Sequence, residues 1–359
     1  MNTKIYQLNS AGADDEAAFR EAGRILQSGG LVAFPTETVY GLGGNGLDPA
    51  AARKIYAAKG RPSDNPLILH IASRGELDPL VEHVPEAARR LMDAYWPGPL
   101  TLIFQKSSLV PHETTGGLDT VAVRMPEHEA ARRLIAAAGV PVAAPSANLS
   151  GRPSPTTASH VIEDMNGRIE MILDGGDCRI GLESTIIDVT GDYPVVLRPG
   201  FIGHAELDRL FGRVEDDPAL HAGGDLKARP KAPGMKYRHY APQASVTIVE
   251  GASGPLVAER IRQLATEEIR QGKRVCVLCG TDTLPAYEGF PTVCVGNRSC
   301  DETIAHELFR VLRGFDENGV ECVFSESFEG GAHGEAIMNR LRKAAGYHIV
   351  QVRDEDGKV

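Results

Sequence analysis

The chain has 359 residues, of which 42% are hydrophobic and 24% are charged, and a formal net charge of −10. This length suggests two domains, each able to bury a core of its own. The acidic balance argues against a general nucleic-acid coat protein, although it leaves room for a local basic patch. The sequence has no apolar run as long as a membrane span, and its N-terminus, "MNTKIYQLNS", lacks the apolar region of a signal peptide. We therefore expect a cytoplasmic enzyme or binding protein.

Over the first part of the chain, short apolar runs rich in Val and Ile alternate with helical patterns. Strands are expected at 31–34, 67–72, 100–104, 120–125, 140–145, 170–174 and 185–189. Apolar residues at helical spacing predict helices at 86–95, 127–138 and 204–211. The alternation predicts an α/β domain over residues 1–220, with a large, twisted, mixed sheet and helices packed on it.

The segment "GLGGNG" (41–46) matches the glycine spacing of a dinucleotide-binding loop. In that fingerprint the last glycine belongs to the start of the next helix. Here the helix is predicted to start later, at Asp48-Pro49, because Asp is a good N-cap and Pro a good first-turn residue. A lone glycine pattern is a weak signal, so we do not assign a dinucleotide site. The sequence also lacks the G-x-x-x-x-G-K-[ST] pattern of a P-loop.

A polar stretch rich in Gly, Pro and Lys, "HAGGDLKARPKAPGMKYRHYAP", predicts a linker over 221–243. After it, strands are expected at 245–251, 274–279 and 322–326, and helices at 255–270, 301–314 and 332–345. Crossovers of this length favour parallel pairing, so residues 244–359 are predicted to form a smaller, Rossmann-like parallel α/β domain.

Six cysteines in a chain of this length do not indicate a disulfide scaffold. Cys276 and Cys279 form a C-x-x-C, but "RVCVLC" is typical of a buried strand, and no second pair follows at zinc spacing. We expect core cysteines and no protein-held metal.

The stretch "KGRPSDNPL" (59–67) places two cations two residues apart. A residue that precedes proline is pushed towards extended geometry, where side chains at i and i+2 point the same way. Lys59 and Arg61 could therefore converge on one anion, such as a polyphosphate. The alternative is that Lys59 complements the dipole of a helix ended by Gly60, while Arg61 is solvated.

Further polar clusters stand where predicted strands begin or end, the usual place for a ligand site in an α/β fold. They are Thr36-Glu37-Thr38, Ser146-Ala147-Asn148, Glu183-Ser184-Thr185 and Arg198. Each alone is also compatible with an ordinary turn or helix cap.

Together, "FPTETVYGLG", "KGRPSDNPL", "PSAN" and "ESTIID" resemble the YrdC-like domain of threonylcarbamoyl-AMP synthases. "PGMKYRHYAP" and "AIMNRLRKAA" resemble the linker and C-terminal domain of that family's long form, so the resemblance covers nearly the whole chain. It implies a nucleotidyltransferase that joins L-threonine, bicarbonate or CO2, and ATP into L-threonylcarbamoyladenylate and pyrophosphate. A separate transferase complex then modifies adenosine 37 of ANN-decoding tRNAs to threonylcarbamoyladenosine.

The resemblance also implies roles for particular residues. Lys59 and Arg61 would hold phosphates and the developing carbamate charge, which makes them the expected catalytic residues. ATP contacts are implied for Lys59, Arg61, Asn65, Thr120, Ser146, Asn148, Ser154, Arg198 and Tyr240. The threonine pocket would be lined by Thr38, His70, Arg124, Ala144 and Ser184. Arg124 is the natural partner of the amino-acid carboxylate. Any Mg²⁺ would arrive with ATP, held by phosphates and water.

The linker is expected to act as a lid over ATP, with Tyr240 touching the nucleotide. Two other functional classes are compatible with parts of the sequence. A basic run could instead track RNA phosphates and give weak tRNA contact: Lys227, Arg229, Lys231, Lys236 and Arg238. Carbamoyl transfer to a protein thiol, as in hydrogenase-maturation relatives, would need a cysteine array that this chain lacks. The segment "GGAHGEAIMNRL" (330–341) favours a tight turn into an amphipathic helix over a phosphate-binding helix start.

Overall fold

The computed structural model describes residues 1–8, 13–221, 230–233 and 239–353. The chain divides into two compact units, Met1–Ser150 with Ser154–Lys236, and Gly151–Pro153 with Tyr237–Val359. Most of the predicted linker, including Lys227, Arg229, Lys236, Tyr237 and Arg238, lies outside the described residues. The predicted domain limits themselves stay predictions.

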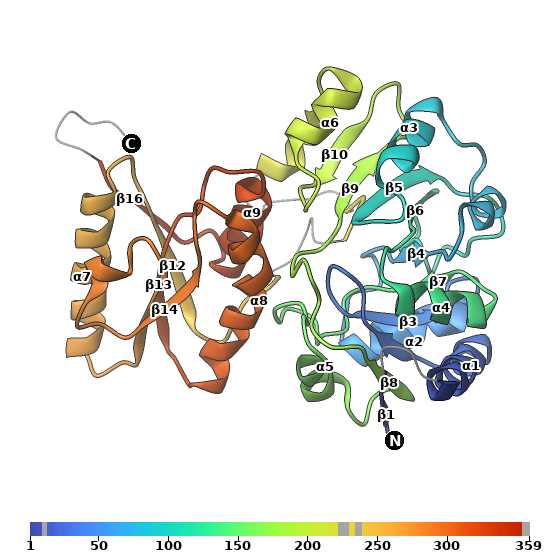
Figure 1. Cartoon of the computed structure of the whole chain (residues 1–359), viewed down its shortest axis with the longest axis horizontal. Helices are drawn as coiled ribbons and strands as arrows, with labels where there is room; N and C mark the ends of the chain where they lie inside the picture. Colours follow the sequence, from blue (N-terminus) through green and yellow to red (C-terminus); the bar gives the residue numbers. More distant parts are fainter. Residues whose placement is uncertain (9–12, 222–229, 234–238, 354–359) are drawn as a thin grey trace. The chain divides into compact units, whose positions relative to one another are not determined.

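The first unit is built on an eleven-stranded sheet with the order β1-β8-β2-β3-β7-β4-β6-β5-β9-β10-β11 (Figure 1). Its strands are β1 (Lys4–Gln7), β2 (Val32–Phe34), β3 (Gly41–Asn45), β4 (Ile68–His70), β5 (Leu100–Gln105), β6 (Thr120–Arg124), β7 (Val142–Ala143), β8 (Met171–Asp174), β9 (Thr185–Asp188), β10 (Val195–Arg198) and β11 (Glu215–Asp216). The sheet contains both parallel and antiparallel pairs, so the predicted mixed sheet is confirmed.

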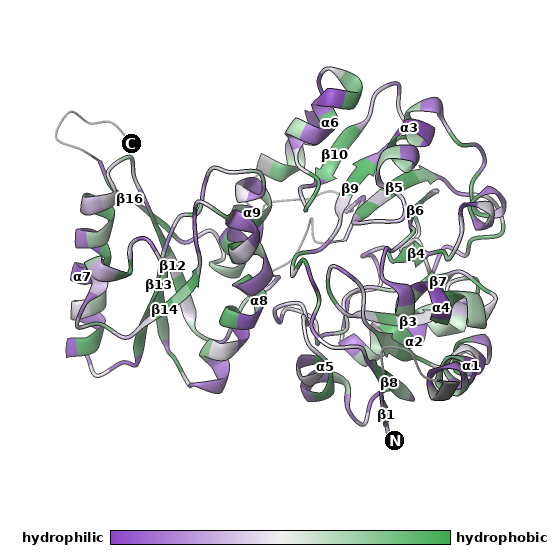
Figure 2. Cartoon of the chain, viewed as in Figure 1, coloured by the Kyte–Doolittle hydropathy of each residue, from purple (hydrophilic) through white to green (hydrophobic). Residues whose placement is uncertain are grey.

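Helices cover both faces of this sheet: α1 (Ala13–Gln27), α2 (Pro49–Lys59), α3 (Glu86–Tyr95), α4 (Glu129–Ala138), α5 (Ala158–Met165) and α6 (His204–Phe211). One apolar core joins α1 and α4 to alternate residues of β2 and β8. A second core joins α2, α3 and α5 to the opposite face. Figure 2 shows these helices apolar on one side and hydrophilic on the other.

The glycine-rich segment 41–46 is a strand rather than a phosphate loop. β3 pairs antiparallel with both β2 and β7. A Cβ on Gly43 would lie 2.8 Å from the Val142 Cγ1 atom, so a glycine is needed there to let neighbouring side chains approach. Helix α2 begins after it with Asp48 as the N-cap, whose carboxylate accepts from the Ala50 N–H at 2.8 Å, as predicted.

The predicted strand over 140–145 is reduced to the two residues of β7. Pro141 and Pro145 flank it, and neither has a backbone N–H to offer to a ladder. The chain then leaves the sheet, and this exit sets the position of Ser146 and Asn148.

The second unit is a five-stranded, fully parallel sheet with the order β14-β13-β15-β12-β16. Its strands are β12 (Ser245–Glu250), β13 (Val275–Gly280), β14 (Thr292–Gly296), β15 (Cys322–Glu326) and β16 (Ile349–Gln351), and its helices are α7 (Gly254–Arg270), α8 (Asp301–Glu317) and α9 (Gly334–Ala344). Helix α7 covers one face, and α8 and α9 cover the other (Figure 1). Cys276 and Cys279 lie buried in β13.

The segment 330–333 forms a turn into α9, as favoured by its sequence. Gly330 and Gly331 have φ of 96° and 72°. At the helix start, the His333 backbone N–H donates to Asp301 Oδ2 at 2.6 Å, and the His333 ring lies 3.0 Å from the other oxygen. A protein carboxylate therefore accepts the bond from the N-cap N–H of α9.

Candidate functional site

The site is organised by the register of the central strands of the first unit. His70 on β4 pairs with Arg124 on β6, which in turn pairs with Thr101 on β5. Thr101 pairs with Ile186 on β9, and Ile186 pairs with Arg198 on β10. Directly paired residues project from the same face of a sheet. Side chains far apart in the sequence thus stand in one row on one face.

The same face continues as an apolar surface beside this row. It is formed by Ile68, Ile103, Ala122, Ile186 and Leu197, and Ala232 from the linker packs on it with no exposed area. Arg198 Nη1 also donates to the Pro233 carbonyl at 3.4 Å. The described piece of the linker, residues 230–233, therefore lies against the face that carries the row.

Arg124 is buried, with 4% of its surface exposed, and is held by three acceptors. Its Nη2 donates to Glu37 Oε1 at 2.6 Å, its Nη1 to Thr38 Oγ1 at 2.9 Å, and its Nε to the Gly98 carbonyl at 3.3 Å. Burial alone would raise the pKa of Glu37, but the neighbouring guanidinium holds that pKa below its usual value. The pair is therefore an ion pair, Glu37⁻ with Arg124⁺.

The hydroxyl of Thr38 has a defined hydrogen-bond direction. The Thr36 hydroxyl donates to the Val39 carbonyl at 2.7 Å, which uses its single proton. The 2.8 Å bond between the Thr36 and Thr38 hydroxyls must then be donated by Thr38. Thr38, which also receives a bond from Arg124, can offer a ligand only an acceptor.

His70 is a neutral imidazole in this setting. Burial, with a smaller contribution from the Arg124 charge, lowers the pKa of His70 to about 3. Its Nδ1 lies 3.1 Å from the Ile68 carbonyl, and its ring meets Phe34 edge-on. The backbone N–H of Ala144 donates to the same Ile68 carbonyl at 2.9 Å, which brings the end of β7 next to His70.

Lys59 is the last residue of α2, and Gly60 caps the helix with φ of 62°. The alternative in which Lys59 ends a helix closed by Gly60 is therefore confirmed, and Lys59 and Arg61 are not at i and i+2 of one extended segment, because the left-handed glycine turns the chain between them. Lys59 Nζ donates to the carbonyls of Ser146 and Asn148. The Ser146 hydroxyl donates to Asn148 Oδ1 at 2.6 Å, so Lys59, Ser146 and Asn148, three of the nine residues predicted to contact ATP, form one cluster.

Arg61 is not solvated, since only 8% of its surface is exposed. Its guanidinium donates to the Pro66 carbonyl at 3.1 Å and to the Asn65 carbonyl at 3.4 Å. Asn65 is 1% exposed, and among the described residues its side-chain Oδ1 has no hydrogen-bond donor. A buried amide oxygen without a donor is costly, and this one is suited to a ligand N–H.

A third cluster surrounds Ser184. Its hydroxyl lies 2.7 Å from Thr101 Oγ1, and its carbonyl accepts from Arg198 Nη2 at 2.9 Å. Nearby in the sequence, Glu183 accepts from the Ser154 hydroxyl at 2.6 Å. Our sequence analysis missed Thr101; the only available signal was a lone hydroxyl inside the apolar run 100–104.

Two of the predicted residues stand apart from these clusters. Thr120 begins β6, half-buried, two and four positions before Ala122 and Arg124, and so shares their face. Tyr240 belongs to the second unit, where it stacks on Phe309 with ring centroids 5.1 Å apart. It adopts φ of 63°, which is unusual for a residue other than glycine.

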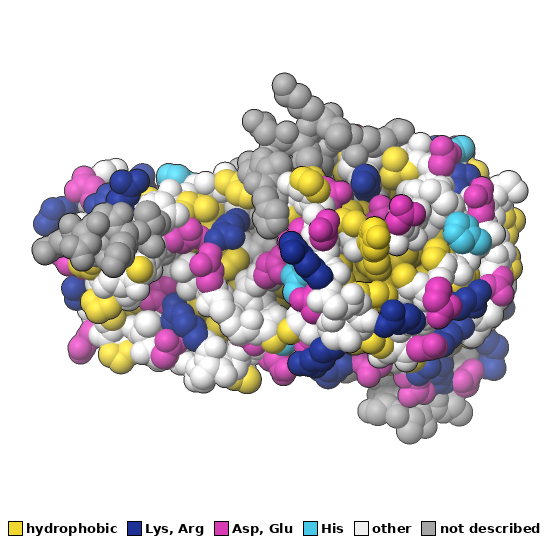
Figure 3. Space-filling model, turned by 90° about the horizontal axis from the view of Figure 1, so that it is seen from above, with side chains coloured by type: hydrophobic (Ala, Val, Ile, Leu, Met, Phe, Trp, Pro, Cys, Tyr) yellow, Lys and Arg dark blue, Asp and Glu magenta, His cyan; other side chains and the backbone are white. Residues whose placement is uncertain are grey.

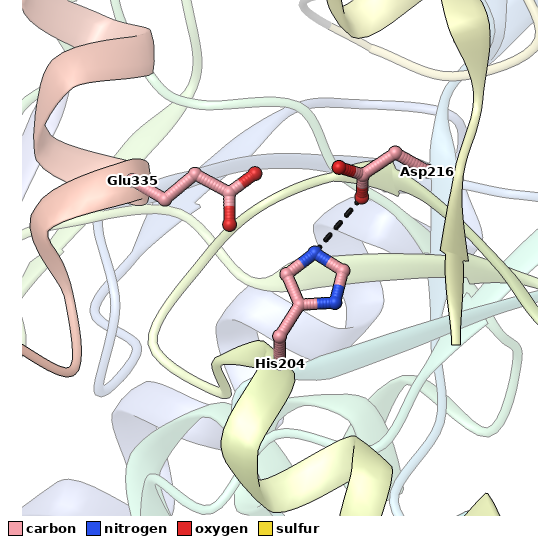
Figure 4. Close-up of side chains that lie close together, drawn as sticks. All are labelled: His204, Asp216 and Glu335. Atoms are coloured by element: carbon pink, nitrogen blue, oxygen red, sulfur yellow. Dashed lines mark hydrogen bonds and ion pairs between the residues drawn. The ribbon is translucent and has the colours of Figure 1, made fainter. Parts of the chain in front are cut away.

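His204 at the start of α6 lies 2.9 Å from Asp216 of β11 through its Nε2 atom, which ties helix to strand (Figure 4). Figure 4 also draws Glu335, which belongs to helix α9 of the second unit.

On the face seen in Figure 3, basic and acidic side chains of the described residues are interspersed, with no broad basic field for a nucleic acid. Among the described residues, no helix is long and apolar enough to cross a membrane.

The first unit belongs to the Sua5/YciO/YrdC class: residues 24–200 match the model of that family, described as telomere recombination. Residues 202–346 match a model described as the C-terminal domain of threonylcarbamoyl-AMP synthase. A threonylcarbamoyl-AMP synthase of Pyrococcus abyssi is 50% identical over 338 residues, 94% of this chain and 97% of its own. One from Bacillus subtilis is 47% identical over 332 residues, 92% of this chain and 94% of its own.

A crystal structure of P. abyssi Sua5 complexed with L-threonine matches with a TM-score of 0.90 at 47% identity, and covers 98% of this chain and 100% of that one. The chain therefore belongs to the threonylcarbamoyl-AMP synthase family.

Proposed function

We propose that this chain forms L-threonylcarbamoyladenylate and pyrophosphate from L-threonine, bicarbonate or CO2, and ATP, which makes it a nucleotidyltransferase. The names of the relatives, and the threonine bound by one of them, support this activity. The observation that carries it in this chain is the buried Arg124 guanidinium. A guanidinium has five N–H groups. The three bonds described above leave two of them without an acceptor among the described residues, which suits a bidentate carboxylate.

The reaction requires positioning and charge neutralisation rather than a covalent nucleophile. The threonine amine takes up CO2 to give an N-carboxylate. A carboxylate oxygen then attacks the α-phosphorus of ATP in line, the bond to the β-phosphate oxygen breaks, and pyrophosphate leaves. Arg61 and Arg198 would balance the phosphate charge, while Lys59 holds the 146–148 turn through two carbonyls.

The threonine subsite would combine the Arg124 donors with the Thr38 acceptor, beside His70, Ala144 and Ser184. ATP would contact the remaining predicted residues, which are Lys59, Arg61, Asn65, Thr120, Ser146, Asn148, Ser154, Arg198 and Tyr240. Mg²⁺ would enter on the ATP phosphates, and Glu37 would not be a ligand because it is paired with Arg124. The product would pass in the cytoplasm to a tRNA threonylcarbamoyl transferase complex, with at most weak direct tRNA contact.

Pyrophosphate release measured with each substrate omitted in turn tests this proposal. We expect release to need ATP, bicarbonate and threonine together. Serine should support it less well, because one methyl group gives discrimination of about 1–3 kcal/mol in an apolar pocket. Equal release without bicarbonate would indicate simple aminoacyl adenylation and would overturn the proposal.

A further inference from the structure

Glu37 has no part in the chemistry above, yet its carboxylate contacts the side chain that would hold the substrate. We propose that Glu37 is a positioning residue of the threonine subsite, which fixes the Arg124 guanidinium so that two of its N–H groups stay available to the amino-acid carboxylate. The inference rests on the proposed function, since it takes threonine as the ligand of Arg124.

The guanidinium is held on all three of its nitrogens. Its acceptors come from separate parts of the chain: Glu37 Oε1 at 2.6 Å, Thr38 Oγ1 at 2.9 Å and the Gly98 carbonyl at 3.3 Å. A planar fork with an acceptor on each nitrogen cannot turn about its long axis without losing bonds. Glu37 makes the shortest of the three bonds and is the only charged acceptor among them, so its loss should free the fork most.

Glu37 is itself held by hydrogen bonds to its side chain and to its backbone. Its second carboxylate oxygen accepts from the His128 backbone N–H at 3.4 Å, immediately before α4. Its own carbonyl accepts from the Ile180 N–H at 2.8 Å. The Glu37 carboxylate therefore has little freedom to move, and it holds the Arg124 guanidinium in a fixed position.

The charge of Glu37 also explains why Arg124 can stay buried before the substrate binds. The side chains of Arg124 and Glu37 are 5% and 3% exposed. A cation at that depth needs a partner, and removal of one member leaves the other uncompensated. With the pair intact, the arriving carboxylate meets a preformed fork rather than a side chain that must be reoriented.

The test is to measure threonine and ATP binding separately, by calorimetry, in the full-length protein. We expect Glu37→Ala to weaken threonine binding by about 10- to 100-fold, the effect of misplacing a binding group by roughly 1 Å, with ATP binding unchanged. Glu37→Gln keeps the shape and one acceptor oxygen, so it should restore part of the loss. Glu21→Gln is the matched control, because Glu21 forms an exposed ion pair of the same 2.6 Å length with Lys4.

A double-mutant cycle separates positioning from a general structural role. If Glu37 acts through Arg124, Glu37→Gln should cause no further loss of threonine affinity in an Arg124→Met background. Additive losses, or an equal loss of ATP affinity, would overturn the inference, and so would unchanged threonine binding in Glu37→Gln. A wild-type protein that binds no threonine would overturn the proposed function and this inference with it. Glu37→Gln keeps the test valid if Glu37→Ala does not fold.

Discussion

The arginines of the site share a feature that sequence alone does not reveal: all are buried, and all donate to backbone carbonyls. Arg61, Arg124 and Arg198 are 8%, 4% and 4% exposed. Their carbonyl partners are those of Pro66, Gly98 and Ser184. A carbonyl orients a guanidinium but carries no net charge of its own. Arg124 also has a carboxylate partner, Glu37.

Arg61→Ala should lower the rate of pyrophosphate release at least 100-fold, since it removes a phosphate-binding charge. Because Arg61 is buried rather than solvated, the substitution should also destabilise the fold by about 1–3 kcal/mol, through the carbonyls left without a donor. Arg61→Lys keeps the charge but loses the planar fork, and it is the matched comparison. Urea unfolding and turnover check both effects. Full turnover of a folded Arg61→Ala protein would show that Arg61 supports the fold and is not needed for the reaction.

His70 predicts a pH dependence of stability. Its pKa is about 3 in the folded protein, below the usual histidine value of 6.5. Between these pH values, His70 is protonated in the unfolded chain and neutral in the folded chain. The free energy of unfolding therefore falls as the pH is lowered through this window. The slope should approach about 1.4 kcal/mol per pH unit. We expect His70→Gln to flatten the decline in unfolding free energy between pH 6.5 and 5. This range lies above the lowered pKa of Glu37. An equally steep decline in the variant would contradict the assignment of a buried, neutral histidine.

At the scale of elements, the site depends on how closely neighbouring segments approach. The turn after β10 presses on the start of β9. A Cβ on Gly200 would lie 2.3 Å from the Thr185 backbone N and 2.6 Å from the Ser184 carbonyl carbon. Ser184 in turn contacts Thr101 and Arg198. A glycine thus sets the geometry of the third cluster without contributing a functional group.

Gly200→Ala should therefore displace Ser184, lower the affinity for ATP and threonine, and destabilise the first unit by about 1–3 kcal/mol. Gly75→Ala is the control, because a Cβ at Gly75 meets nothing within 4 Å and Gly75 has no positive φ. Thermal unfolding and calorimetric binding would be compared for both variants. Equal unfolding temperatures and equal ligand affinities of the two variants would show that the close approach at Gly200 affects neither stability nor binding.

At the scale of the whole molecule, the linker is the segment whose role remains a prediction. Its described part, 230–233, packs within the first unit, where Ala232 is buried against Ile68 and Ile186. A chain that ends at residue 226 would expose this apolar surface and release Arg198 from the Pro233 carbonyl. A chain that ends at residue 236 would keep both contacts.

We expect the 1–236 chain to release pyrophosphate faster than the 1–226 chain. In the intact protein, ATP and threonine together should protect residues 227–242 from protease, and Tyr240→Ala should lose turnover or leak the intermediate. Ala232→Asp in the full chain should resemble the shorter truncation, since a carboxylate there would be buried among apolar side chains. If residues 1–226 alone match the full-length rate, with no protection of the linker, the segment is only a tether.

The elements that the sequence determined by itself are those whose signals are local. Helices 86–95 and 204–211 and strand 322–326 have the predicted limits because periodicity and flanking turns are short-range properties. The family resemblance was equally available, since its motifs are short linear stretches.

Tertiary structure alone decided which groups meet. Glu37 and Arg124 are 87 residues apart, and Thr101 and Ser184 are 83 apart. Neither pair could be found by counting along the chain, because the order of strands in the sheet and the loops at their ends, rather than sequence distance, bring the partners together. Burial by the fold likewise excluded the solvated position that the sequence left open as an alternative for Arg61. Burial of this kind depends on packing by distant segments, which no local pattern encodes.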